Sequence, residues 1–193
     1  MRRTRRGSWV VATLGVATLA AVPAAAAVSF GEHDVQTIFY ISKSDDRNRV
    51  DYAIRLDQTC QPIGSTPIYA YWRRFEPGQP PLGDLNSLDE RAYGISRQWV
   101  RTAAPNGVWL EMHLSGFAEQ RFLVLVQRGG AGECHARAML PIRSRDAYLD
   151  HIHVTLGFVG IDHVTLHGRD AATNAEVSES LRPPSRGPLG FGG

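Results

Sequence analysis

Thr66-Pro67-Ile68-Tyr69-Ala70-Tyr71-Trp72-Arg73-Arg74-Phe75 is followed, after a loop rich in proline and glycine, by Leu85-Asn86-Ser87-Leu88-Asp89-Glu90-Arg91-Ala92-Tyr93-Gly94. In the first segment alternate side chains such as Ile68 and Trp72 fall on one face, as in a β-strand. In the second, the leucines and Ala92 are spaced like one side of a short helix that Gly94 can end. The sequence therefore predicts a strand, a bend and a short helix, the one connection in the chain that is not a simple turn between strands.

The chain around this connection is predicted to consist of short strands. Their expected ranges are 37–43, 49–58, 66–76, 95–103, 107–115, 120–128, 134–143, 146–158 and 161–168. Glycine-rich turns join them, and the Asn106-Gly107 step is typical of a tight hairpin. Short strands with short turns and one helix indicate an all-β antiparallel meander. We expect it to close into a calycin-like barrel with one short helix, with a two-sheet β-sandwich as the alternative.

Residues 1–27 have the pattern of an export signal peptide. Four arginines precede an apolar run from Val10 to Val22, and small residues that suit cleavage follow it. We expect a single all-β domain over residues 28–181 and a disordered tail over 182–193, whose proline and glycine content cannot bury an apolar face. This organisation predicts a periplasmic or secreted protein. The sequence leaves open the secretory or twin-arginine route, and also the oligomeric state.

The charge of the chain after signal removal argues against two classes of partner. Without the four arginines of the signal, 17 Lys and Arg remain against 19 Asp and Glu. Recognition of nucleic acid calls for a clustered basic surface, so no nucleic-acid partner is expected. The remaining chain also has no Lys/Arg-rich tract for anionic lipid, and no membrane insertion is expected after signal cleavage.

The chain contains two cysteines, Cys60 and Cys134, and both lie outside the predicted signal. An even number of cysteines in an oxidising compartment indicates a disulfide. Two separate thiols are the alternative. Neither cysteine has a second Cys or His at the spacing of a zinc finger, so a metal site built on them is not expected.

A histidine-rich hairpin is predicted over residues 151–167. Its two strands, His151-Ile152-His153-Val154-Thr155-Leu156-Gly157 and His163-Val164-Thr165-Leu166-His167, both alternate between apolar and polar side chains. The polar residues of both strands should share one face. We expect His153 opposite His167 and Thr155 opposite Thr165, with opposed Cβ atoms about 5 Å apart.

Opposed imidazoles can share a divalent metal ion, the only cofactor that the sequence suggests. The candidate ligands are His151, His153, His163 and His167, with a carboxylate such as Asp150 or Asp170. The repeated His-Val-Thr-Leu also resembles the paired His-x-Thr motifs of two-histidine phosphoesterases, which implies histidines as acid and base and hydroxyls that hold phosphate. The remaining alternative is an ordinary polar strand face, which such residues suit equally well.

Aromatic residues offer a different kind of site. Six of them are candidates for lining a pocket inside the barrel: Tyr69, Tyr71, Trp72, Tyr93, Trp99 and Trp109. Such a pocket would take a small apolar or ring-bearing ligand, although aromatic side chains are also common in ordinary β-cores. The sequence contains no nucleophile elbow and no His-Glu-x-x-His motif. It therefore predicts a non-catalytic module that binds such a ligand or a cell-envelope partner.

Several short motifs together resemble a bacterial family, domain of unknown function 4833. The resemblance rests on Thr37-Ile38-Phe39-Tyr40-Ile41-Ser42-Lys43, Asn48-Arg49-Val50-Asp51-Tyr52-Ala53, Tyr71-Trp72, Ala92-Tyr93-Gly94, His167-Gly168-Arg169-Asp170 and Val177-Ser178-Glu179. Together these motifs cover roughly residues 35 to 180. The resemblance implies an exported protein and no particular activity.

Overall fold

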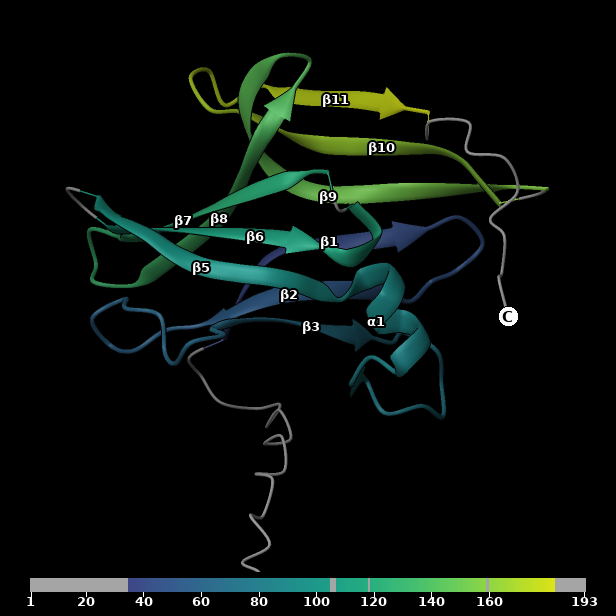
Figure 1. Cartoon of the computed structure of the whole chain (residues 1–193), viewed down its shortest axis with the longest axis horizontal. Coiled ribbons are helices and arrows are strands. Elements are labelled where there is room, and N and C mark those ends of the chain that lie inside the picture. Colours follow the sequence, from purple (N-terminus) through teal and green to yellow (C-terminus); the bar gives the residue numbers. More distant parts are fainter. Residues whose placement is uncertain (1–34, 105–106, 118, 159, 183–193) are drawn as a thin grey trace, which may run out of the picture.

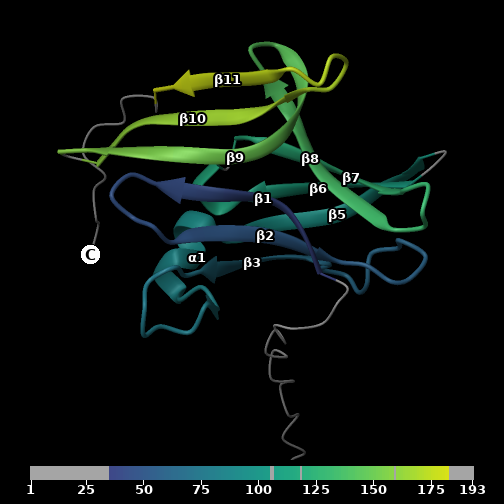
Figure 2. The same ribbon diagram turned by 180° about the vertical axis from the view of Figure 1, so that it is seen from behind.

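The structure is a computed structural model that describes residues 35–104, 107–117, 119–158 and 160–182. These residues form eleven strands, one α-helix and one 3₁₀ turn (Figures 1 and 2). The strands are β1 (Val35–Lys43), β2 (Arg49–Arg55), β3 (Ile68–Arg73), β4 (Leu82–Gly83), β5 (Ile95–Ala104), β6 (Gly107–Leu114), β7 (Arg121–Arg128), β8 (Cys134–Ile142), β9 (Arg145–Gly157), β10 (Gly160–Asp170) and β11 (Glu176–Leu181). The helices are α1 (Ser87–Tyr93) and the 3₁₀ turn η1 (Ser115–Phe117). In this part of the chain no helix is long and apolar enough to cross a membrane.

All nine predicted strands are present, with ends shifted by a few residues. The prediction missed β4, which has only two residues, and β11, which has the polar sequence Glu-Val-Ser-Glu-Ser-Leu. β11 forms because it pairs with β10 along the outer edge of the sheet. The predicted signal peptide lies outside the described residues, as does the predicted tail beyond Arg182.

The predicted helix is confirmed, and its first residue is set by a capping box. The side chain of Asn86 accepts the backbone N–H groups of Leu88 and Asp89, each at 2.9 Å, and the Asp89 carboxylate accepts the N–H of Asn86. The indole N–H of Trp72 donates a hydrogen bond to the same carboxylate oxygen of Asp89, at 2.9 Å. The same aspartate therefore begins the helix and fastens it to β3.

The predicted closed barrel is wrong, because the strands form one continuous sheet whose two end strands do not pair. The order is β4-β3-β2-β1-β9-β8-β7-β6-β5, and β10 and β11 extend from the other edge of β9. The sheet folds over, so that β5–β7 face β1–β3 in Figure 1. Phe39 of β1 stacks on Phe122 of β7 across the interior, with ring centroids 5.7 Å apart. The alternative of a sandwich therefore describes the two layers but not their connection, which is a single sheet.

The connection between the layers is made by β9. Through Tyr148 this strand pairs antiparallel with β8, and from His151 onward it pairs parallel with β1. Between these two segments Asp150 forms a bulge against β10. Leu149 faces the core before the bulge and Ile152 faces it afterwards, so the bulge reverses the alternation of the strand. A meander of hairpins contains no parallel pairing, which is why the sequence did not predict this junction.

The interior between the layers is filled by side chains. Tyr52 is fully buried and stacks on Phe39 with ring centroids 4.5 Å apart. The hydroxyl of Tyr52 donates a hydrogen bond to the backbone carbonyl of Tyr93, 2.6 Å away, at the end of α1. The space in which the barrel prediction placed a ligand is occupied here by the core.

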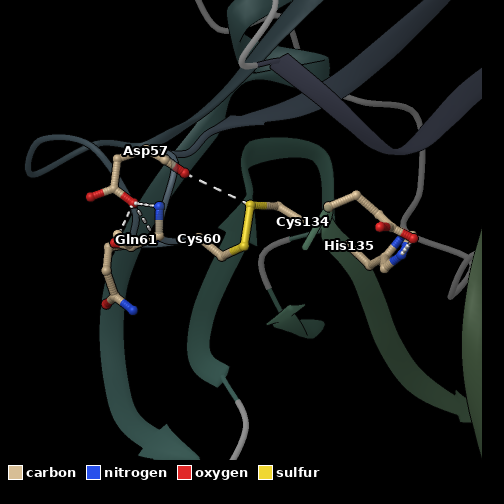
Figure 3. Close-up of a disulfide and its surroundings, with 7 residues drawn as sticks. Asp57, Cys60, Gln61, Cys134 and His135 are labelled. Atoms are coloured by element: carbon tan, nitrogen blue, oxygen red, sulfur yellow. Dashed lines mark hydrogen bonds and ion pairs between the residues drawn. A yellow bond between two sulfur atoms is a disulfide. The ribbon is translucent and has the colours of Figure 1, made fainter. Parts of the chain in front are cut away.

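The predicted disulfide between Cys60 and Cys134 is present and joins the two layers (Figure 3). It ties the connection that follows β2 to the first residue of β8, with the Cα atoms 5.3 Å apart. The carboxylate of Asp57 shapes this connection by accepting the backbone N–H groups of Thr59 and Gln61, both at 2.8 Å. A cross-link between residues 74 positions apart restricts the unfolded chain strongly, an effect of about 4 kcal/mol in the chain-entropy model.

A glutamine side chain bridges the two layers where their edges meet at β3 and β5. The amide of Gln98 in β5 accepts the backbone N–H of Ile68 at 2.9 Å and donates to the backbone C=O of the same residue at 2.8 Å. Both backbone groups of Ile68 belong to β3, so this one side chain replaces a ladder partner. The layers are thereby held together on the side opposite β9 without closing the sheet.

We expect Gln98→Leu to lower the free energy of unfolding by about 1–3 kcal/mol, because the N–H and C=O of Ile68 lose their partners. Gln127→Leu on an exposed position of β7 is the control, with an expected change of less than about 0.5 kcal/mol. Urea unfolding of the disulfide-intact protein, followed by tryptophan fluorescence, measures both. Equal effects of the two substitutions would show that the bridge contributes nothing specific.

Candidate functional site

A polar surface, here called the histidine face, covers the outer side of β1, β9 and β10. It consists of Tyr40, Ser42, His151, His153, Thr155, His163, Thr165 and His167. The prediction that the histidines and threonines of the hairpin share one face is confirmed, because apolar residues such as Ile152 and Val164 alternate with them and are buried. These polar side chains are half-buried by one another.

The predicted register of this hairpin is wrong by two residues. The opposed pairs are His151 with His167, His153 with Thr165, and Thr155 with His163. The shift arises because the strands continue to the pair Gly157–Gly160 and then accommodate a bulge at Asp162. His153 therefore does not face His167, as the sequence had indicated.

Aromatic rings and a guanidinium form a stacked row on the histidine face. The rings of His151 and His167 are 4.3 Å apart and nearly parallel, with 8° between their planes. Tyr40 stacks on the other side of His151 at 4.9 Å, and Arg49 lies 4.1 Å above the Tyr40 ring. Each group restricts the orientation of the next, so the row runs unbroken from β2 to β10.

This stacking does not suit a metal site on His151 and His167. The lone pairs of an imidazole lie in the plane of its ring, and in parallel stacked rings they cannot converge on one ion. Elsewhere on the face, His153 bonds Ser42 at 3.0 Å and His163 bonds Thr155 at 3.1 Å. Among the described residues no group of three or more His, Cys, Asp or Glu side chains is placed to hold a metal ion.

The hydroxyl and imidazole pairs form short chains that can pass a proton. In one of them the Thr155 hydroxyl contacts Nε2 of His163, and Nδ1 of that ring contacts Asp162 at 3.0 Å. The carboxylate favours a protonated Nδ1 and leaves Nε2 as the acceptor for the hydroxyl. The arrangement resembles a general-base pair, but its members lie on an open sheet surface where water also reaches them.

A buried carboxylate lies beside this face on β2. Asp51 is fully buried, and its oxygens bind Arg49 at 2.7 Å and Arg73 at 2.5 Å. Arg73 also donates a hydrogen bond to the Tyr71 hydroxyl at 3.1 Å. A buried charge is tolerated when it is paired in this way. The network therefore fixes the guanidinium of Arg49 over Tyr40.

A cleft of about 650 Å³ opens where the sheet forks, between β1 and β8. It exists because β9 has no paired residue on this edge at Leu149 and Asp150, between the end of its pairing with β8 and the start of its pairing with β1. We call it the fork cleft. Its lining includes Tyr40, Arg49, Arg137, Tyr148, Asp150 and Arg169.

The two sides of the fork cleft have the same chemistry. On one side Arg49 lies over Tyr40, and on the other Arg137 lies over Tyr148 with 5.1 Å between the guanidinium carbon and the ring centroid. Sequence reasoning did not identify these four residues as a site. They come from four strands, β1, β2, β8 and β9, whose spatial order depends on the parallel pairing that the sequence did not reveal.

The aromatic residues predicted to line one pocket lie in three separate places. These are Tyr69, Tyr71, Trp72, Tyr93, Trp99 and Trp109. Trp72 and Tyr93 contact each other edge to face under α1, with centroids 5.8 Å apart. The two tyrosines of β3 lie on its outer face, and the two tryptophans lie on the outer faces of β5 and β6. The structure therefore does not bring the six together.

Comparison with known proteins gives one match. The model of the family described as Domain of unknown function (DUF4833) matches residues 39–180, a range that includes β2 to β10 and every residue of the fork cleft named above. No curated protein and no solved structure matches the chain.

The environment of His151 lowers its pKa, chiefly because burial disfavours the charged ring and next because His167 repels it. We expect His151 to titrate below the ordinary imidazole value of about 6.5. His167→Gln should raise the pKa of His151 by removing the coulombic repulsion from the His167 ring, whereas His135→Gln on β8 should not change it. NMR titration of the imidazole resonances measures these shifts. A His151 pKa at or above the ordinary value would contradict the stacked arrangement.

Proposed function

Because the chain belongs to the family of domain of unknown function 4833, whose description assigns no activity, we propose its role from the geometry: it is an exported, non-catalytic β-domain that binds a small ring-bearing ligand in the fork cleft. The expectation of a small apolar or aromatic ligand is kept from the sequence. Its place moves from the interior of a barrel to the junction of the two layers.

The observation that carries this proposal is the pair of tyrosines on opposite sides of one cleft. Tyr40 and Tyr148 each present a ring whose orientation an arginine restricts. Phe39, Ala136 and Leu149 add apolar surface to the lining. A volume of about 650 Å³ lies in the range of sites for small molecules, which combine apolar lining with a few polar groups. These features suit a ligand with one planar ring.

The composition of the lining supports binding rather than turnover. Of the described residues that line the fork cleft, none is a histidine, a cysteine or a serine. Covalent and acid–base catalysis commonly pair a nucleophile with a histidine base, and the four histidines of β9 and β10 lie on the neighbouring open face instead. A cell-envelope protein that inserts an aromatic side chain into the cleft is the alternative ligand within the same proposal.

A second candidate function is a phosphoesterase-like activity on the histidine face. The observation that favours it is the interleaving of the two His-x-Thr motifs: His153 lies opposite Thr165, and His163 lies opposite Thr155. Each imidazole is thus beside a hydroxyl of the other motif, with 3.1 Å between Thr155 Oγ1 and His163 Nε2. One ring could serve as base and the other as acid toward a phosphodiester laid across the two strands.

Native mass spectrometry of protein purified from its host tests the proposed function. We expect a specific small mass to be retained by the wild type and by Tyr69→Ala, a control in which Arg55 lies over an equivalent tyrosine outside the cleft. Tyr148→Ala should lose about five-fold in occupancy at limiting ligand, since one aromatic contact contributes about 1 kcal/mol. Unchanged retention in Tyr148→Ala would contradict the cleft. Hydrolysis of a nitrophenyl phosphodiester that disappears in His163→Gln would instead favour the second candidate.

A further inference from the structure

Positive charge gathers around the fork cleft. Three arginines, Arg49, Arg137 and Arg169, line it against one carboxylate, that of Asp150. Beyond residue 27 the chain has two more acidic than basic side chains, so this excess is local to the cleft. A concave site lined by one sign of charge attracts ligands of the opposite sign.

The three arginines differ in what already neutralises them. Arg49 is held by the buried carboxylate of Asp51 at 2.7 Å. Arg169 lies 3.8 Å from the carboxylate of Asp150 and 3.6 Å from that of Glu176, and both carboxylates are exposed to solvent. Arg137 has no carboxylate within 4.0 Å in the described part of the chain, and its contact there is the ring of Tyr148. Arg137 is therefore the cation with donors left for a ligand.

Tyr148 also prepares Arg137 for this role. A guanidinium held over an aromatic ring keeps its own N–H groups in the guanidinium plane, where they can bind two oxygens side by side. The loss of side-chain freedom on binding is then smaller than for an arginine in open solvent. Arg137 and Tyr148 both line the cleft, so one ligand can contact both.

We propose that the ligand of the fork cleft carries an anionic group, a carboxylate or a phosphate, and that Arg137 binds it. This inference rests on the proposed function and names the chemical class of its ligand. The acid group lies at the Arg137 side, with its planar part against Tyr148 and beside the edge of the Tyr40 ring, whose faces contact Arg49 and His151. Arg169 adds a second cation, while Asp150 repels an acid group that is placed toward its own end of the cleft.

The test uses four probes on the full mature protein after removal of any retained ligand: phenyl phosphate, benzoate, neutral benzamide and inorganic phosphate. Amide NMR titrations at millimolar concentrations report both affinity and place. We expect phenyl phosphate or benzoate to shift the resonances of Tyr40 and Tyr148 and to bind about ten-fold more tightly than benzamide. The preferred acid identifies the group as phosphate or carboxylate. Added salt should weaken the binding of the acids and leave the affinity for benzamide unchanged.

Arg137→Gln should remove the ten-fold preference for the acids without changing the affinity for benzamide. Arg121→Gln is the matched control, because Arg121 is an exposed arginine of β7 outside the cleft lining. Equal affinity for acids and benzamide, or an unchanged preference in Arg137→Gln, would overturn the anionic ligand and leave the proposed function standing. Probes that shift no resonance of the cleft would overturn both. Binding of inorganic phosphate as tight as that of phenyl phosphate would show that the ring contributes nothing, which contradicts the proposed function alone.

Discussion

β9 pairs with two different strands along one of its edges, antiparallel with β8 through Tyr148 and parallel with β1 from His151 onward, and both layers of the fold depend on this change of partner. The bulge at Asp150 makes the change possible, because it moves the core-facing positions from odd to even residue numbers. At the neighbouring position on β10, a Cβ added to Gly168 would overlap the carbonyl oxygen of Tyr148, so the close approach of the two backbones at the bulge suits glycine. The disulfide and the Gln98 bridge then hold the layers together at other points.

Local features of the fold could be predicted from the sequence because each is encoded within a few residues. Patterns of apolar and polar residues predicted nine of the strands and the shared polar face of residues 151–167, and the Asn86–Asp89 spacing is consistent with the helix that follows. The bulges at Asp150 and Asp162 have no comparable signal, and each moves the register of the strand that carries it. The parallel pairing of β1 with β9 joins segments more than one hundred residues apart, so hairpin reasoning led to a closed meander instead of a folded sheet.

The candidate site could not be predicted from the sequence for the same reason. His151 and His167 could be recognised as neighbours in a hairpin, but the register that stacks them depends on the Asp162 bulge. Arg137 and Tyr148 meet only because β8 and β9 pair up to that point and then separate. The single local hint was the polar alternation of Arg49 and Asp51 between buried apolar residues of β2, which indicates a charged outer face without naming its neighbours. The proposed site is thus tied to the junction between layers more than to any one motif.

A crystal structure of the protein with whichever of phenyl phosphate and benzoate binds more tightly is the most direct test of the claim that the fork of the sheet is the binding site. The account predicts ligand density between Tyr40 and Tyr148, with the acid oxygens about 2.7–2.9 Å from the guanidinium of Arg137. It also predicts that β8 and β1 keep their separate pairing with β9 around that density. Ligand density on the histidine face, with the fork cleft occupied only by water, would contradict it.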